Sequence, residues 1–180
     1  KQIRVIKPRI GGGFGTKQEV LLEQLCAALT LATKRPVLYE LTRAQEFLSR
    51  TRHPQVIHVA IGADDSGKIE AIDLDVLMNS GAYGSHALTV ACNSGSKVLP
   101  LYPCDNVKFR ARTAYTNMPV GGAYRGYGAT QAAFAVESLV DDLAEELGMD
   151  PLDFRVKNHI RSGQSSPIFA ALGEGRPGVD

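Results

Sequence analysis

The 180-residue sequence predicts an α+β fold in which helices pack on a mixed β-sheet. Two neighbouring segments, residues 55–63 and 68–83, alternate apolar and polar side chains on either side of the turn sequence DDSG, as a β-hairpin does. Residues 107–115 alternate in the same way. Two longer segments, 18–33 and 130–147, repeat their apolar residues at helical spacing. Strands and helices in this order indicate an α+β domain with a mixed sheet.

The first fifty residues are expected to contain two short strands and two helices. Residues 2–7 and 36–41 have the apolar, β-branched character of strands. The helix at 18–33 has carboxylates in its first turns, where the helix dipole favours them, and Pro36 stops it. Thr42 is a candidate N-cap for a short helix or turn.

The clearest helix covers residues 130–147, and Gly148 is a candidate C-cap. A further helix starts with Asp150 as N-cap and Pro151 at the first helical position. Residues 86–100 fit neither helix nor strand clearly. The face of the long helix expected to point inward consists of Ala133, Phe134, Leu139, Val140, Leu143 and Leu147.

The composition is that of an ordinary globular protein, with 44% apolar and 22% charged residues. A net charge of +1 argues against nucleic acid or an anionic membrane as partner. No apolar run approaches the roughly 18 residues of a membrane span. The three cysteines, Cys26, Cys92 and Cys104, match no zinc or iron–sulfur spacing and indicate a reducing compartment, the cytoplasm. Cys26 is expected to be buried in its helix.

Two glycine-rich loops, GGGFGTK at 11–17 and GGAYRGYG at 121–128, each precede a helix. Exposed N–H groups at a helix N-terminus bind anions, which favours a ligand with phosphates or other polar groups. Counted from Gly11, both nucleotide-binding spacings place Thr16 where glycine is required, so a nucleotide-dependent transferase is the weaker hypothesis. Either loop alone is equally compatible with a structural turn.

The two loops together resemble those of the molybdopterin-binding subunit of the xanthine dehydrogenase family of molybdenum hydroxylases. The similarity covers nearly the whole chain and is closest to the bacterial branch. The motifs that carry it are GGGFGTK, TRHP at 51–54, SGAY at 80–83, TNMP at 116–119, AYRGYGATQAAFAVE at 123–137 and LGMDPLDFRVKN at 147–158. It implies a partial molybdopterin-binding domain at 1–162, then a linker at 163–180, within a longer polypeptide.

The resemblance also implies which residues hold the cofactor. In this family the first loop lays its backbone against molybdopterin, and an arginine of the second loop lies near the metal. No side chain ligates molybdenum directly, although Phe14 and Arg125 would lie close to it. A core position for Phe14 and a surface ion pair for Arg125 remain open. The cofactor-binding residues are then Gly12, Gly13, Phe14, Gly15, Arg125 and Gly126.

Three positions are implied for the substrate pocket. Gln18 stands where purine-oxidising members carry a glutamate, and an amide cannot act as an anion. Tyr127 matches an aromatic residue that faces the substrate and can stack on a flat ring; ordinary packing is the alternative. Asn93 falls, by ungapped spacing, where those members have an arginine, and no arginine occurs from 84 to 109. Other N-heterocycles, or aldehydes, are therefore open as substrates.

Three histidines and Glu137 are further candidate functional residues. His53, in an extended segment before a proline, is expected to be structural. His58 is expected to face solvent from mid-strand, and His86 lies near the presumed site. Glu137 either ties the second loop to the body of the domain or belongs to a solvated helix face.

The family reaction hydroxylates an electron-poor carbon with oxygen from water. The resemblance implies molybdopterin, with or without a cytosine nucleotide, and 2Fe-2S clusters and FAD on other subunits or domains. It places the general-base glutamate beyond Asp180 and a glutamine contact before Lys1, so the chain alone should be inactive. The expected partners are the rest of its own subunit, the iron–sulfur and FAD units, and a heterocyclic or aldehyde substrate. A non-catalytic cofactor-binding module is the competing hypothesis.

Overall fold

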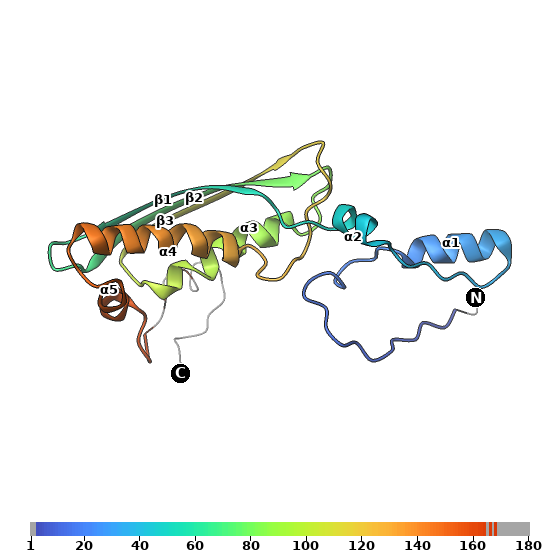
Figure 1. The fold of residues 1–180 in the computed structure, drawn as a ribbon, viewed down its shortest axis with the longest axis horizontal. Helices are drawn as coiled ribbons and strands as arrows, with labels where there is room; N and C mark the ends of the chain where they lie inside the picture. Colours follow the sequence, from blue (N-terminus) through green and yellow to red (C-terminus); the bar gives the residue numbers. More distant parts are fainter. Residues whose placement is uncertain (1–2, 165, 167, 169–180) are drawn as a thin grey trace.

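The computed structural model describes residues 3–164, 166 and 168, and it confirms the α+β architecture with a mixed sheet. The sheet has the order β1-β2-β3, with β1–β2 antiparallel and β2–β3 parallel. Helices α3 and α4 cover one face of it, and α1 projects beyond its far end (Figure 1). The elements are α1 Glu23–Thr33, α2 Arg43–Ser49, β1 Gln55–Ala63, β2 Ile69–Gly81, α3 Ala87–Ser96, the 3-10 turn η1 Leu99–Leu101, β3 Asn106–Tyr115, α4 Ala129–Glu146 and α5 Pro151–Asn158.

The hairpin between β1 and β2 forms where the sequence predicts it. Asp64 builds the turn: its carboxylate accepts hydrogen bonds from the backbone N–H groups of Ser66 at 2.9 Å and Lys68 at 3.0 Å. Every second residue of β2 then faces the helices, because side chains alternate along a strand. These inward side chains, which are at most 2% exposed, are Ile72, Leu74, Val76 and Met78.

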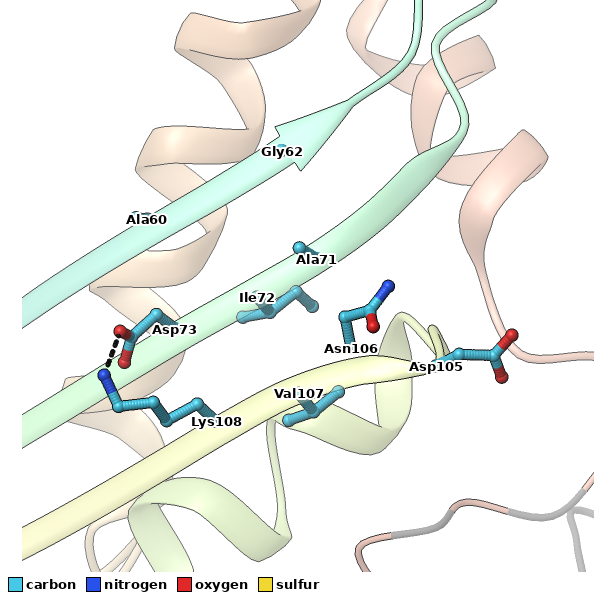
Figure 2. A pocket seen from close by; sticks show the side chains of 9 residues that line it. All are labelled: Ala60, Gly62, Ala71, Ile72, Asp73, Asp105, Asn106, Val107 and Lys108. Carbon is cyan, nitrogen blue, oxygen red and sulfur yellow. Dashed lines mark hydrogen bonds and ion pairs between the residues drawn. The ribbon is translucent and has the colours of Figure 1, made fainter.

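The opposite face of the sheet is polar, and no helix of the described chain covers it (Figure 1). Asp73 pairs with Lys108 at 2.7 Å, and Asp75 pairs with Arg110 at 2.9 Å. A shallow hollow of about 520 Å³ lies between the three strands near the hairpin, floored by short side chains such as Ala71 (Figure 2). It lies at the opposite end of the sheet from the glycine-rich loops and brings no catalytic grouping together.

Helix α4 is present as predicted, but the predicted inward face is partly wrong. Val140 is buried and Ala133 borders the core, whereas Phe134 is 77% exposed. Leu143 and Leu147 also border the core. The fully buried stripe repeats every fourth residue and contains two alanines, because small side chains let α4 lie close to α3 and β1. This stripe is Ala132, Val136, Val140 and Ala144.

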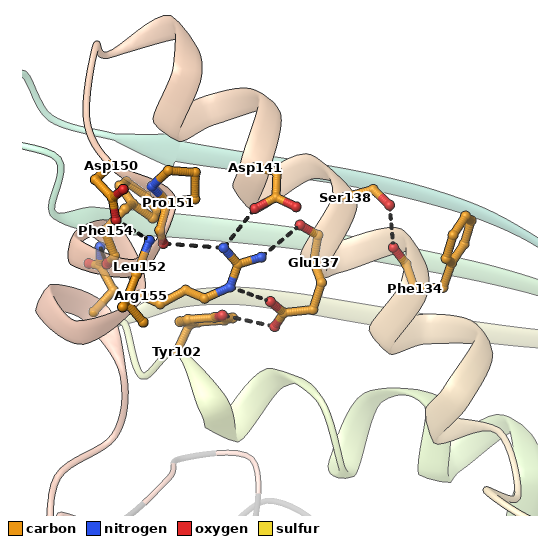
Figure 3. Close-up of polar contacts among 11 residues, drawn as sticks. Tyr102, Phe134, Glu137, Ser138, Asp141, Asp150, Pro151, Leu152, Phe154 and Arg155 are labelled. Carbon is orange, nitrogen blue, oxygen red and sulfur yellow. Dashed lines mark hydrogen bonds and ion pairs between the residues drawn. The ribbon is translucent and has the colours of Figure 1, made fainter.

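Glu137 connects α4 to two other elements rather than to the second glycine loop, which corrects both expectations for it (Figure 3). Its carboxylate accepts from the Tyr102 hydroxyl at 2.8 Å and from Arg155 Nε at 2.8 Å. Arg155 also donates to Asp141 at 2.6 Å. Hydrogen bonds to Asp141 and Glu137 raise the pKa of Arg155 above its ordinary value. The cluster fastens α5 and the segment after α3 onto α4.

Tyr102→Phe is expected to change how stability responds to alkaline pH. Burial, and then the bond to Glu137, raise the pKa of Tyr102, so the folded state keeps this phenol neutral while the unfolded state ionises above about pH 10. The raised pKa contributes stability that is complete below pH 10 and lost above it. Urea unfolding should show the variant less stable by about 1–2 kcal/mol at pH 7. The difference in unfolding free energy between the two proteins should narrow above pH 10. A difference that stays constant there would contradict the role given to the raised pKa of Tyr102.

The first fifty described residues differ most from expectation. The strands expected at 2–7 and 36–41 are not found: residues 3–7, the described part of the first, and residues 36–41 have no partner strand within the described chain. Helix α1 begins at Glu23 rather than at 18, and none of its residues is buried, so Cys26 is only partly covered. Helix α2 begins as predicted, with Thr42 and Gln45 forming a reciprocal capping box.

The remaining segments are the ambiguous one at 86–100, helix α5 and the predicted linker. The ambiguous segment 86–100 forms α3 and η1. Helix α5 starts as predicted, since Asp150 accepts from the N–H groups of Leu152 and Asp153. Most of the predicted linker at 163–180 lies outside the described residues. Within the part of the chain that is described, no helix has the length and apolarity needed to cross a membrane.

Candidate functional site

The two glycine-rich loops contain the same backbone turn. In residues 13–16 the N–H of Thr16 donates to the carbonyl of Gly13 at 2.9 Å, around Phe14 at φ 48° and Gly15 at φ 96°. Residues 126–129 repeat this bond at 2.9 Å, around Tyr127 at φ 48° and Gly128 at φ 96°. Positive φ at both central positions, with this bond, defines a type I′ turn. A bulky aromatic residue there is strained, and such strain clusters at functional sites.

The first loop lies directly against the second. A Cβ atom added to Gly15 would come within 2.4 Å of the carbonyl oxygen of Ala123 and 2.9 Å of the amide nitrogen of Tyr124. Glycine therefore allows a backbone contact that no other residue would. Two loops about 110 residues apart in sequence thus form one surface.

The surface contains an open hollow of about 380 Å³. It collects most of the residues that the sequence singles out, and Gly12 and Gly13 directly precede its first lining residue. Asn93 is not among the lining residues; it lies half-buried on α3, where it accepts from Ser96 Oγ at 3.3 Å. The hollow is lined by Phe14, Gly15, Gln18, Tyr124, Arg125, Gly126 and Tyr127.

Arg52 holds the second loop in place, a role that the sequence does not reveal beyond its position in the TRHP motif. Its guanidinium donates to the carbonyl of Arg125 at 2.5 Å and to Thr130 Oγ1 at 2.6 Å. It also lies over the ring of Tyr124, 4.7 Å from the centroid, in a cation–π contact. One side chain thereby braces both ends of the turn that carries Tyr127.

Arg52→Lys is expected to loosen this loop, because an ammonium cannot reproduce the fork of donors or the planar stacking. We expect limited proteolysis to cut within residues 121–130 several times faster in the variant. Arg43→Lys is the matched control, since Arg43 is exposed and its only ion pair among the described residues is with Glu46 in its own helix. Equal cleavage rates for all three proteins would contradict the bracing role.

A polar cluster lies behind Tyr127. The sequence predicts only that one of its members, His86, lies near the site. The Tyr127 hydroxyl bonds to His86 Nδ1, and burial raises the pKa of Tyr127. His86 Nε2 lies 3.8 Å from a carboxylate oxygen of Glu19. Glu19 also pairs with Arg50 and accepts from Ser85.

The hollow has free hydrogen-bond donors suited to an anionic or strongly polar ligand. Among the described residues, nothing pairs with the Arg125 guanidinium, which is exposed beside Gly126. The backbone N–H groups of Phe14 and Gly15 likewise donate to no acceptor within the described chain. A pterin with a phosphate tail needs such main-chain and guanidinium donors, so these residues fit that group.

His53 and His58 are placed as expected. His53 is 1% exposed, and its Nδ1 lies 2.9 Å from the carbonyl oxygen of Asn79, which makes it a structural residue. His58 lies on the exposed face of β1. In the described part of the chain, no group of three or more His, Cys, Asp or Glu side chains could hold a metal ion.

Comparison with known sequences agrees with this geometry. Residues 1–159 match the family described as "Molybdopterin cofactor-binding domain". The probable hypoxanthine oxidase XdhD of Escherichia coli K12 is 46% identical over 176 residues, which are 97% of this chain and 18% of that protein. The nicotinate dehydrogenase large molybdopterin subunit of Eubacterium barkeri is 36% identical over 163 residues, 90% of this chain and 38% of that protein.

Solved structures show the same fold. Aldehyde oxidoreductase from Desulfovibrio gigas superposes with a TM-score of 0.81 at 36% identity, covering 88% of this chain and 18% of that one. Quinoline 2-oxidoreductase from Pseudomonas putida 86 gives a TM-score of 0.81 at 28% identity, covering 89% and 22%. The chain thus spans only part of each relative. It belongs to the molybdopterin cofactor-binding domain family, in the group that contains the xanthine dehydrogenases.

Proposed function

We propose that this chain supplies part of the molybdopterin cradle and one wall of the substrate pocket in a molybdenum hydroxylase that acts on an N-heterocycle. The observation that carries the proposal is the meeting of the two glycine-rich loops at Gly15 and Ala123, with one hollow between them. When bound, the cofactor would supply the two-electron oxidation of a substrate carbon.

The cofactor side of the hollow is formed by backbone and one cation. Gly15 lets the first loop lie against the backbone of the second, Gly12 and Gly13 lead into the hollow, and the N–H groups of Phe14 and Gly15 donate to no acceptor among the described residues. Arg125 and Gly126 approach from the second loop, where the guanidinium would bind cofactor oxygens or phosphate. In this proposal the metal is held by the organic cofactor and not by side chains of this chain.

The substrate side is formed by Gln18 and Tyr127. The Gln18 amide can both donate to and accept from a polar ring edge. The Tyr127 ring can stack on a flat heterocycle and thereby exclude water. Asn93, half-buried on α3, would contribute only from outside the hollow. The general base and a glutamine contact to the metal centre would come from parts of the protein other than this chain.

Oxidation of an aldehyde is the second candidate. Aldehyde oxidoreductase of Desulfovibrio gigas matches this chain at the same TM-score, 0.81, as quinoline 2-oxidoreductase. Two of the relatives, the probable hypoxanthine oxidase XdhD and the nicotinate dehydrogenase large molybdopterin subunit, are named for N-heterocycles. An aromatic wall with an amide beside it favours the heterocycle.

The wider assembly is part of the proposal. Electrons would leave through 2Fe-2S clusters to FAD on other subunits or domains, and the remainder of the molybdopterin subunit would close the site. A cytoplasmic location and either cofactor form, with or without a cytosine nucleotide, are compatible with this scheme.

Turnover in water enriched in oxygen-18 tests the proposed function. The protein that carries this chain, purified with its partners, should oxidise purine, nicotinate or quinoline faster than small aldehydes. Mass spectrometry should find the label in the hydroxylated product, because the oxygen comes from water. A hydroxyl group without the label would show that its oxygen did not come from water and would overturn the hydroxylase reaction, whereas turnover of aldehydes alone would overturn the heterocycle assignment. Bound cofactor without any turnover would favour a non-catalytic module.

A further inference from the structure

We propose that Glu19 and His86 are positioning residues that hold the aromatic wall of the hollow, Tyr127, in register with the first glycine-rich loop. This inference rests on the proposed function only in assigning the hollow to a substrate. The positioning itself rests on contacts between the two loops and α3.

Glu19 is the hub of the arrangement. It directly follows Gln18, and its side chain is 20% exposed. One carboxylate oxygen pairs with Arg50 Nε, and the other accepts from Ser85 Oγ. Arg50 is itself mostly buried, with 14% of its side chain exposed. A single carboxylate thus joins three segments: the one between the first glycine-rich loop and α1, the one after α2, and the one before α3.

His86 carries this link on to the second loop. Its Nε2 lies 3.8 Å from Glu19 Oε1, and its Nδ1 bonds to the Tyr127 hydroxyl. The two rings pack edge to face, with centroids 5.5 Å apart and planes at 74°. The tyrosine hydroxyl is therefore anchored toward α3, which leaves the ring rather than the hydroxyl to line the hollow.

The backbone of Tyr127 makes such an anchor necessary. A tyrosine at φ 48° is strained, and a strained residue persists only when its surroundings fix it. The bond to His86 restrains the side chain, and Arg52 restrains the loop through the carbonyl of Arg125. Without Glu19, the imidazole loses the carboxylate that orients it, and Tyr127 gains rotational freedom.

The consequence concerns ligand class. Gln18 and Tyr127 line the same hollow from different loops, and Glu19, next to Gln18, connects them through His86. A fixed ring serves a flat heteroaromatic substrate, which needs a stacking surface at a defined distance. A small aliphatic aldehyde has no face to stack. The positioning cluster therefore favours flat heteroaromatic ligands over aliphatic ones.

Nitration of Tyr127 by tetranitromethane, followed by peptide mass spectrometry, tests the positioning directly in the full protein. Glu19→Ala and His86→Ala should raise the nitration rate of Tyr127 about threefold or more, while Tyr115, which is 74% exposed, keeps its rate as an internal reference. Glu19→Gln still accepts from Ser85 and should give an intermediate rate. Glu70→Gln, at an exposed ion pair with Lys68, is the matched control and should change nothing.

Steady-state kinetics give a second test, with a heterocycle that the protein oxidises in the turnover experiment described above. The two alanine variants should raise KM about three- to tenfold with kcat within about twofold, because they weaken ligand binding without touching the reacting atoms. Unchanged Tyr127 nitration in Glu19→Ala, Glu19→Gln and His86→Ala would overturn the positioning role. Faster nitration in a protein that oxidises no heterocycle would instead keep the positioning role and reject the proposed function.

Discussion

Gly15→Ala is expected to abolish most cofactor binding while leaving the sheet intact. The new methyl group would lie 2.4 Å from the carbonyl oxygen of Ala123, an atom of the second loop's backbone that cannot rotate away. The left-handed backbone at φ 96° adds about 1–2 kcal/mol of strain for an alanine. Each 1.4 kcal/mol is a factor of ten in affinity. Molybdenum content of the purified protein should therefore fall about tenfold or more.

Gly11→Ala is the control that separates loop contact from loop composition. Gly11 belongs to the same run of glycines, but an added Cβ there meets nothing within 4 Å. Its molybdenum content should match the unsubstituted protein when both are measured by elemental analysis. Equal losses in the two variants would mean that loop flexibility, rather than the approach of Gly15 to Ala123, decides binding.

Gly128→Ala is expected to cost the largest stability, about 3 kcal/mol or more. Its Cβ would come within 2.1 Å of the carbonyl oxygen of Val90 and 3.0 Å of Ser94 Oγ, where the start of α4 rests on α3. Overpacking at a close contact costs about 1–3 kcal/mol, and the left-handed conformation at φ 96° adds to this cost. Urea unfolding followed by circular dichroism should show the loss.

Gly148→Ala isolates the strain component of that loss. Gly148 follows α4 in the left-handed conformation at φ 64°, but its added Cβ would meet nothing within 4 Å. A loss of about 1 kcal/mol is expected there, well below that of Gly128→Ala. If the two substitutions lower the free energy of unfolding equally, the packing of Gly128 on α3 contributes nothing to stability. The described contact between the second loop and α3 would then be wrong.

The elements that the sequence predicted well are those with strong local signals. The hairpin has alternation on both sides of an Asp-rich turn, and helix α5 has Asp150 and Pro151 at its start. The expected strands at 2–7 and 36–41 have apolar character but no partner strand in the described chain, so propensity alone did not decide their structure. The inward face of α4 was misjudged because close packing selects small residues such as Ala132 and Ala144 over Phe134.

The site shows the same division. The two loops and six of the residues that line the hollow were predictable. Runs of glycine are easily recognised in a sequence, and the two loops together resemble those of a known family. The contact of Gly15 with Ala123, the repeated type I′ turn and the Arg52 brace depend on distances between segments that lie far apart in the chain. Glu19 is indistinguishable in sequence from a carboxylate in the first turns of a helix, so its role as a hub was not accessible.

Elemental analysis of the native complex that contains this chain, purified without denaturant, tests the central claim most directly. We expect about one molybdenum per copy of the chain, together with iron, and a loss of molybdenum in Gly15→Ala but not in Gly11→Ala. A complex from molybdenum-replete cells that contains no molybdenum would contradict the cofactor cradle and leave the two glycine-rich loops as features of the fold alone.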